Sequence, residues 1–167
     1  MLLSYQGAQL KECKCFLSRL RTWASIVAFI QHNMRCVIVF DLETTGLESD
    51  CEIISIGAIA VNWEDGVELD GGRFEGHIVP RGSIPGEATA VNGFTKENGL
   101  LYKRGEVVQE AVSPQEGLKS FAEFLSNPAF RHLGRVYLLA HGACRFDGPV
   151  LYSNLKLFEV RHTARYM

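Results

Sequence analysis

The first half of the chain alternates apolar and polar residues in ways typical of strands. Residues 37–41 form an apolar, β-branched run that predicts a buried strand, and residues 52–61 predict a second one. Residues 73–79 alternate apolar with polar, as an edge strand does. Turn-prone residues stand at 64–66 and 70–72. The pattern therefore predicts three adjacent antiparallel strands.

Helix signals follow in the middle of the chain. Residues 88–94 are compatible with a short helix whose exit is marked by Gly93. Ser113, Pro114 and Glu116 make a capping-box pattern at the start of a longer helix. Its apolar residues recur at helical spacing and predict a side that faces the core: Leu118, Phe121, Phe124 and Leu125.

A further strand and helix are predicted near the end of the sequence. Residues 136–140 are a short apolar run suited to a buried strand, and Gly148-Pro149 opens a helix. The apolar face of this helix comprises Leu151, Leu155 and Phe158. Asp147 stands at its N-terminus, where unpaired backbone N–H groups keep a carboxylate ionised. A plain helix cap is the alternative interpretation of Asp147.

Composition adds a domain size and an uneven charge. A chain of 167 residues, 47% of them hydrophobic, can bury the core of one globular domain with an appendage. Five basic residues and one acidic residue in the first 35 positions give +4, so the overall charge of −2 leaves −6 on the remainder. These residues are Lys11, Lys14, Arg19, Arg21, Arg35 and Glu12. The acidic remainder argues against a broad basic surface for duplex nucleic acid, but not against a metal-bridged phosphate site.

We divide the chain into a basic N-terminal extension, residues 1–35, which we expect to be helical, and a domain at residues 36–167. An extension that packs or frays beside the domain is the preferred interpretation, and an organelle-targeting segment is the alternative. No apolar run approaches the ~20 residues of a membrane helix, so we expect no membrane association. Five cysteines without a C-x-x-C pair are typical of reduced thiols, which favours a cytoplasmic or nuclear protein.

Two carboxylates, Asp41 and Glu43, end the first predicted strand, and turn-prone residues 44–46 follow them. Residues two apart in a strand point to the same face. Paired carboxylate oxygens suit Mg²⁺ or Mn²⁺ rather than soft metals. A solvated strand edge carries the same pattern, so the pair alone does not decide between the two interpretations.

Three segments, in order, resemble the DEDD 3′-to-5′ exonucleases over residues 36–158. The family's first motif is similar to Phe40-Asp-Leu-Glu-Thr-Thr-Gly-Leu47, and its second is similar to Ala140-His-Gly-Ala-Cys-Arg-Phe-Asp-Gly-Pro-Val-Leu151. Between them, Ile84-Pro-Gly-Glu-Ala-Thr-Ala-Val-Asn-Gly-Phe-Thr95 resembles the short helix after the family's third strand. The longer spacing of the second motif is typical of animal three-prime repair exonucleases, in the histidine-bearing (DEDDh, DnaQ-like) subgroup.

The resemblance implies an α/β, ribonuclease-H-like fold with a mixed central sheet. It implies that Asp41, Glu43 and Asp147 are the catalytic carboxylates and hold two divalent ions, Mg²⁺ or Mn²⁺. The implied reaction is hydrolysis at the free 3′ end of DNA or RNA, with release of nucleoside 5′-monophosphates. The resemblance also implies that the substrate is bound by Thr44, Thr45 and Leu47. Leu47 is expected to pack against the terminal base.

The family's third motif, a histidine or tyrosine shortly before a final aspartate, has no match. No aspartate follows Asp147, and His162 comes too soon after the second motif, so we interpret it as a chance match. We expect the domain to be truncated at its C-terminus and inactive or impaired, since loss of a general base costs ~10² to 10⁴ in rate. The missing strand and helix would expose apolar sheet surface that a protein partner could cover.

Two alternatives stay open. A catalytically silent exonuclease-fold module that binds nucleic acid or protein would explain the missing third motif. An unrelated α/β phosphoesterase using the same carboxylates is the weaker hypothesis, and cleavage at internal sites would favour it. We assign no catalytic role to the remaining candidates, which are His77, His132, His141 and Cys144.

Overall fold

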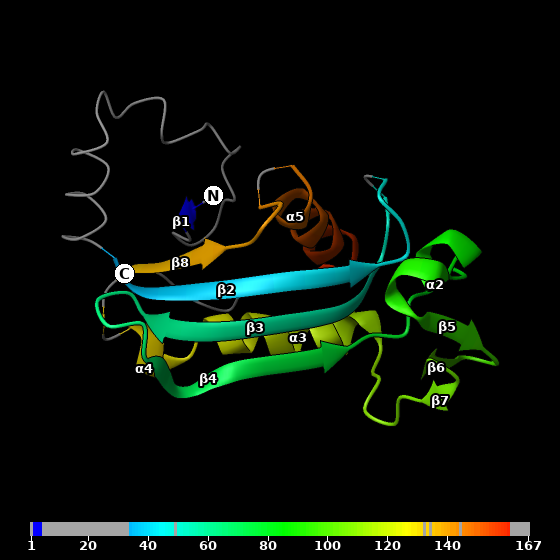
Figure 1. Cartoon of the computed structure of the whole chain (residues 1–167), viewed down its shortest axis with the longest axis horizontal. Coiled ribbons are helices and arrows are strands. Elements are labelled where there is room, and N and C mark those ends of the chain that lie inside the picture. The colour runs from blue at the N-terminus through cyan, green and yellow to red at the C-terminus, as the bar shows by residue number, and fades with distance from the viewer. Residues whose placement is uncertain are drawn as a thin grey trace.

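The computed structural model describes residues 2–4, 34–48, 50–131, 133, 135–143 and 145–160. Its centre is a five-stranded sheet with the order β1-β8-β2-β3-β4 (Figure 1). The strands are β1 (Leu2–Ser4), β2 (Met34–Thr44), β3 (Ile53–Asn62), β4 (Glu68–His77) and β8 (Arg135–Leu139). Strand β2 pairs parallel with β8, whereas β2–β3, β3–β4 and β1–β8 are antiparallel. The predicted trio of antiparallel strands and the mixed central sheet are confirmed.

One of the two predicted turns is instead part of a strand. Residues 70–72 lie inside β4, and the pairing register with β3 shifts between Ile59 and Val61. Gly71 takes a positive φ of 62°, and a Cβ on Gly72 would lie 2.5 Å from the Leu69 carbonyl oxygen. The glycines therefore form an irregularity in a continuing strand, because a bulge needs the same small residues as a turn.

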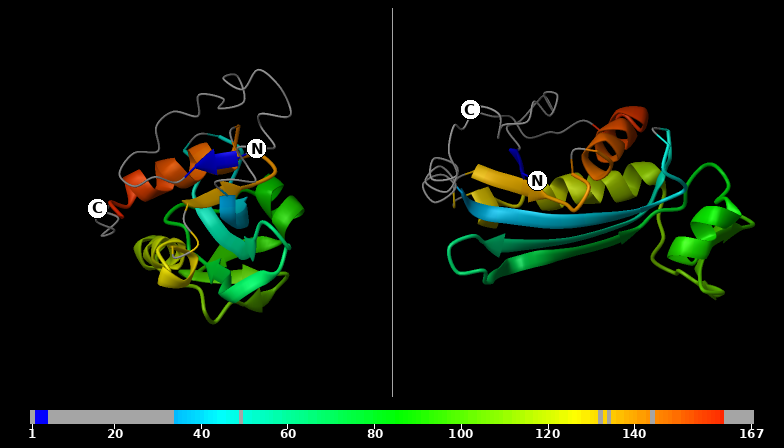
Figure 2. Two further views of the ribbon diagram at one scale, coloured as in Figure 1. Left: turned by 90° about the vertical axis from the view of Figure 1, so that its left-hand side faces the viewer. Right: turned by 45° about the horizontal axis from the view of Figure 1, so that its top comes forward.

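Two helices cover one face of the sheet, as Figure 2 shows from two sides. They are α3 (Pro114–Leu125) and α5 (Asp147–Leu157), and the short α4 (Pro128–Arg131) follows α3. Alternate side chains of β2 point towards these helices, including Ile38 and Phe40, which are 0% and 2% exposed. They join Phe121 of α3 and Leu151 of α5 in the main hydrophobic core. The predicted apolar helix faces are therefore core.

The opposite face of the sheet carries the other side chains of β2. Val37 and Tyr137, paired in the β2–β8 ladder, form a small second cluster and are only 1% and 4% exposed. Val39 on the same face is 39% exposed. This face is thus partly covered rather than bare, and the expected protein partner for it stays a prediction.

A second, smaller sheet was not predicted from the sequence. After α2 (Gly86–Asn92), the strands β5 (Phe94–Glu97), β6 (Leu100–Lys103) and β7 (Glu106–Val107) form a three-stranded antiparallel sheet. The predicted helix at 88–94 therefore starts and ends earlier, since Gly93 at φ 75° ends it and Phe94 begins β5. The buried core beneath this second sheet consists of Phe94, Leu101 and Ile54. Its short strands carry too little periodicity to stand out in the sequence.

Of the expected helical extension, residues 1–35, the structure describes only residues 2–4, 34 and 35. Leu2–Ser4 is a strand, and Met34 and Arg35 already belong to β2, so the two described ends of residues 1–35 are not helical. Residues 5–33 lie outside the described part of the chain, as do His132, Cys144 and His162. None of the described helices has the length and apolar content of a membrane span.

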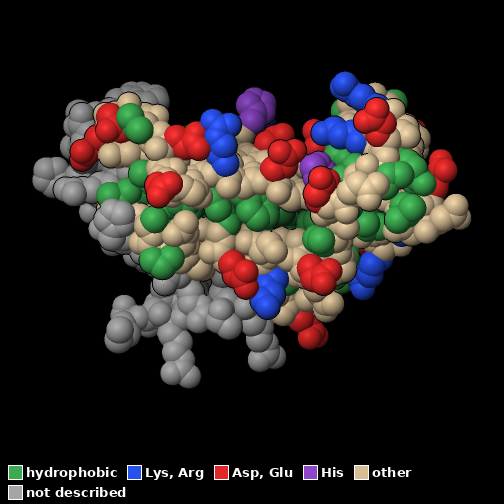
Figure 3. All heavy atoms as spheres, turned by 90° about the horizontal axis from the view of Figure 1, so that it is seen from below, with side chains coloured by type: hydrophobic (Ala, Val, Ile, Leu, Met, Phe, Trp, Pro, Cys, Tyr) green, Lys and Arg blue, Asp and Glu red, His purple; other side chains and the backbone are tan. Residues whose placement is uncertain are grey.

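Seen from the β4 side, the surface carries acidic side chains scattered between isolated basic ones (Figure 3). On β4, the Arg73 guanidinium pairs with the Glu68 carboxylate at 2.7 Å. No continuous basic surface is visible on this face, which agrees with the negative charge of residues 36–167.

Replacing Ser113 with alanine should lower the free energy of unfolding by about 1 kcal/mol. The predicted capping box is present: Ser113 Oγ accepts from the Glu116 amide, and Glu116 Oε2 accepts from the Ser113 amide at 3.1 Å. Urea denaturation followed by circular dichroism measures the change. Ser126→Ala, the same replacement at the other end of α3, should change stability by less than about 0.5 kcal/mol. Equal losses in both variants would contradict the capping role.

The stability of the fold should fall at alkaline pH, in part because of the Cys36 thiol. Burial raises the pKa of Cys36, which is fully buried on β2, from 9.0 to about 11. The unfolded thiol therefore ionises first, and the stability it contributes is present below pH 9 and lost between pH 9 and 11. Chemical denaturation at several pH values should show a smaller decline in Cys36→Val than in the wild type. Parallel declines would contradict the assignment.

Candidate active site

The predicted carboxylate pair lies near the end of β2, on the face opposite α3 and α5. The ladder pairs Asp41 with Gly57 and Glu43 with Ser55, so the two side chains share one face two residues apart. Asp41 is exposed and Glu43 is half-buried. Among the described residues, neither carboxylate has a hydrogen bond or a cation within ion-pair distance. Two neighbouring carboxylates without a described counterion favour the binding of a cation.

A bulge turns the chain just after this pair. The register shifts between Glu43 and Thr44, which pairs with Ile53 of β3. The Thr44 hydroxyl donates to the Gly46 carbonyl at 2.6 Å, and the Thr44 carbonyl accepts from Asn92 Nδ2 of α2 at 3.1 Å. The bulge and these two bonds hold the turn in place beside Asp41 and Glu43.

The three predicted substrate-binding residues differ in how they are engaged. Thr44 is only 8% exposed and its hydroxyl is used within the turn. Thr45 Oγ1 accepts from the Glu52 amide at 2.9 Å, so it too holds the backbone. Leu47 is 83% exposed and projects from the turn. Of the three, Leu47 presents the side chain most open to a ligand.

Asp147 is the first residue of α5 and is 5% exposed. Its Oδ2 accepts a hydrogen bond from the Gly142 amide at 2.9 Å, while the N-terminus of α5 has no side-chain cap. A Cβ on Gly142 would lie 2.8 Å from that oxygen. Glycine at 142 therefore lets the carboxylate approach the loop backbone.

The structure does not bring the three predicted carboxylates into one metal-binding group. Asp41 and Glu43 share a face, but the described residues contain no set of three acidic, histidine or cysteine side chains placed to hold an ion. The donor chemistry of Asp41 and Glu43 still fits Mg²⁺ or Mn²⁺, because both are hard oxygen ligands. Of the described histidines, His141 is exposed and the His77 ring packs against Phe94.

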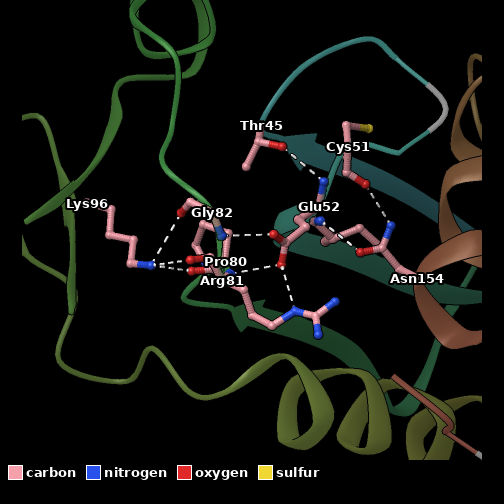
Figure 4. A network of polar contacts seen from close by, with 9 residues as sticks. Thr45, Cys51, Glu52, Pro80, Arg81, Gly82, Lys96 and Asn154 are labelled. Carbon is pink, nitrogen blue, oxygen red and sulfur yellow. Dashed lines mark hydrogen bonds and ion pairs between the residues drawn. The ribbon is translucent and has the colours of Figure 1, made fainter. Parts of the chain in front are cut away.

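A polar network that sequence reasoning missed surrounds the turn (Figure 4). The Glu52 carboxylate accepts from the amides of Arg81 and Gly82 at 2.8 and 2.9 Å. The Lys96 ammonium donates to three carbonyl groups of the same loop, those of Pro80, Arg81 and Gly82. The loop is therefore held through both its N–H and its C=O groups. A glutamate flanking a strand and a lysine within a short strand are too common to signal this role.

Asn154 of α5 forms the other half of this network. It is 2% exposed, its Oδ1 accepts from the Ile53 amide at 3.2 Å, and its Nδ2 donates to the Cys51 carbonyl at 2.9 Å. The only sequence signal is a polar residue between Leu151 and Leu155 of the apolar helix face.

One protein family has a model that matches most of this chain. A family model described as Exonuclease (RNase_T) matches residues 38–158, which include most of β2, both covering helices and all six predicted site residues. The chain belongs to this exonuclease family. No curated protein sequence matches it.

Solved structures support the exonuclease fold. Exonuclease I of Methylocaldum szegediense matches with a TM-score of 0.56 and 16% identity, over 72% of this chain and 23% of that one. Exonuclease I of E. coli, in complex with a dA16 oligonucleotide, matches with a TM-score of 0.55 and 14% identity, over 72% and 23%. A dT13 complex of the same enzyme gives 0.56 and 13%, over 76% and 26%. The chain spans about a quarter of the length of these proteins.

These findings confirm the exonuclease family and its ribonuclease-H-like α/β fold for this chain. The family typically needs divalent metal ions, which agrees with the hard-oxygen donors on β2. The low identity of the solved structures shows the fold alone. The roles of the individual site residues stay predictions.

Proposed function

We propose that this exonuclease domain removes nucleotides from the free 3′ end of DNA or RNA and releases nucleoside 5′-monophosphates. The observation that carries the proposal is the pair Asp41 and Glu43. They share one face of β2 beside an ordered turn, within a chain of the exonuclease family. The long spacing of the second motif supports a likeness to animal three-prime repair exonucleases.

We assign cation binding and contact with the terminal base to different side chains. Asp41 and Glu43 would hold Mg²⁺ or Mn²⁺, and Asp147 would complete the charge of the site from α5. When bound, the two cations supply Lewis-acid stabilisation of the phosphate and of the departing 3′ oxygen. Leu47, 83% exposed, would contact the terminal base.

The rate of residues 1–167 is expected to be low. No aspartate follows Asp147 to act as a fourth carboxylate, and no described histidine lies in a metal-binding group with the pair. Loss of one acid–base group alone costs ~10² to 10⁴ in rate. We therefore expect turnover that is visible only with enzyme in excess.

The test is single-turnover degradation of a 3′-labelled single-stranded oligonucleotide with Mn²⁺ and excess protein. Release of labelled mononucleotide, absent when the 3′ end carries a phosphate, is the expected result. Internal fragments from the blocked substrate would support an unrelated phosphoesterase instead. Binding without any release, by folded protein, would support a silent nucleic-acid-binding module.

A further inference from the structure

The sheet face that carries Asp41 and Glu43 is polar across three strands. Two rows of paired residues cross it from β2 over β3 to β4: Asp41, Gly57 and Glu75 in one row, and Glu43, Ser55 and His77 in the next. Residues paired across a sheet point to the same face. Glu75 and His77 therefore share a face with the carboxylate pair. We call the six residues of these rows the polar strip.

The polar strip is open in its middle. Gly57 is exposed although β3 is a central strand, and a Cβ on it would meet no atom within 4 Å. Ser55, the other residue of the strip on β3, is small and half-buried. Two strand spacings, about 10 Å, separate β2 from β4, which is the length of about three stacked nucleotides. The strip is therefore long enough and open enough for a short stretch of single strand.

The β4 end of the polar strip borders a cavity of about 490 Å³. Figure 1 shows the small sheet just beyond this end of β4. Six charged or titratable side chains line the cavity: Glu75, His77, Lys103, Arg104, Glu106 and Glu110. Three carboxylates repel a phosphate group, whereas the edge of a nucleobase presents hydrogen-bond donors and acceptors side by side. The lining therefore suits a base rather than a phosphate.

Arg104, in the turn between β6 and β7, is the best-placed donor of this lining. Its amide donates to the Gly93 carbonyl at 2.8 Å, and its Cγ would lie 3.2 Å from a Cβ on Gly93. Its φ of 53° lies in the left-handed region that favours glycine. The residue is exposed, and its guanidinium forms no ion pair with any described residue. Arg104 is thus the available cation, because the Lys103 ammonium already lies 4.9 Å from the centre of the Phe94 ring.

Guanine is the base whose edges match this cavity best. Its O6 and N7 accept two hydrogen bonds from one arginine, and its amino group donates to a carboxylate. Arg104 supplies the donors, and the three glutamates of the lining supply acceptors. No other base offers two adjacent acceptors to an arginine together with an amino group for a carboxylate.

We propose that the cavity is a base-binding subsite for the substrate strand, which selects guanine about three nucleotides from the 3′ end through Arg104. The inference rests on the proposed function, which places the terminal nucleotide at Asp41 and Glu43. The strand then follows the polar strip from β2 to β4, with its phosphates towards solvent and one base in the cavity.

The test measures the binding of 5′-labelled single-stranded hexamers by fluorescence anisotropy, in EDTA so that no hydrolysis occurs. One hexamer is oligothymidylate with a guanine third from the 3′ end, and the other carries its guanine at the sixth position. The wild type should bind the first at least about 5-fold more tightly, because a bidentate arginine–guanine pair discriminates by that factor or more. Equal affinities would overturn the inference.

Two variants identify the residue responsible. Arg104→Gly removes the guanidinium and suits the left-handed φ, so the fold is kept. It should bind the two hexamers within about 2-fold of each other, because the arginine–guanine pair is lost. Lys119→Ala removes the same charge from an exposed position on α3, which covers the other face of the sheet, and should keep the preference. A preference retained in Arg104→Gly, or lost in both variants, would overturn the assignment to Arg104.

Nucleotide release separates this inference from the proposed function. Wild-type protein that prefers the first hexamer but releases no mononucleotide with Mn²⁺ would refute the proposed function and leave the guanine subsite in place. Mononucleotide release by protein that binds both hexamers equally would refute the subsite alone.

Discussion

Replacing Asp41 with asparagine should weaken Mn²⁺ binding and slow nucleotide release by about 10²-fold or more. The side chain keeps its size but loses its charge, and Glu43 is left as the one carboxylate on that face of β2 near the turn. Lewis-acid stabilisation by a bound cation contributes several kcal/mol, and each 1.36 kcal/mol is tenfold in rate. Calorimetric titration with Mn²⁺ measures the affinity, and single-turnover release measures the rate.

Asp70→Asn is the matched control for this prediction. It removes the same charge from an exposed position on β4 without touching the turn. Its affinity for Mn²⁺ should equal that of the wild type. If both variants bind Mn²⁺ equally weakly, the effect is one of overall charge rather than of a site. If Asp41→Asn binds as well as the wild type, Asp41 is not a metal ligand.

Replacing Phe121 with alanine should lower the free energy of unfolding by about 3 to 5 kcal/mol. Phe121 is fully buried in α3, and its ring centre lies 5.2 Å from that of Phe74 and 6.4 Å from that of Phe40. The loss combines the removed apolar surface with the cavity left between the helix and strands β2 and β4. A change of this size approaches the whole stability of a small domain.

Equilibrium denaturation in urea measures this loss. Leu157→Ala, at a position 50% exposed near the end of α5, removes another large apolar side chain and should cost less than about 1 kcal/mol. A loss below about 1.5 kcal/mol in Phe121→Ala would contradict the placement of Phe121 at the centre of the aromatic cluster.

Local signals in the sequence predicted most of the central elements. Strands β2, β3 and β8 are apolar runs of strand length, and α3 begins with a capping box that the structure contains. Glycine signals in the sequence were misleading, because turns, strand bulges and helix ends all use glycine. Glycines at 71 and 72 serve a bulge instead of a turn, and the glycine at 93 ends a helix one residue before a strand begins.

The candidate site was only partly predictable. Asp41 and Glu43 share a face because a strand alternates its side chains, and this holds whatever the strand pairs with. The Asp147 carboxylate binds the Gly142 amide, a contact that depends on how the loop after β8 folds. Glu52 and Asn154 gave no motif, since their partners are backbone groups 29 and 101 residues away.

The amino-acid sequence by itself determined strands β2, β3 and β8, the two main helices, the carboxylate pair on β2 and the order of motifs typical of an exonuclease. These depend on periodicity and on neighbours a few residues apart, which a linear pattern contains. Tertiary structure alone decided the parallel pairing of β2 with β8, the small second sheet and the position of α5 against β3. Such contacts join backbone groups distant in the chain, and because every residue carries the same backbone groups, the sequence does not mark which of them will meet.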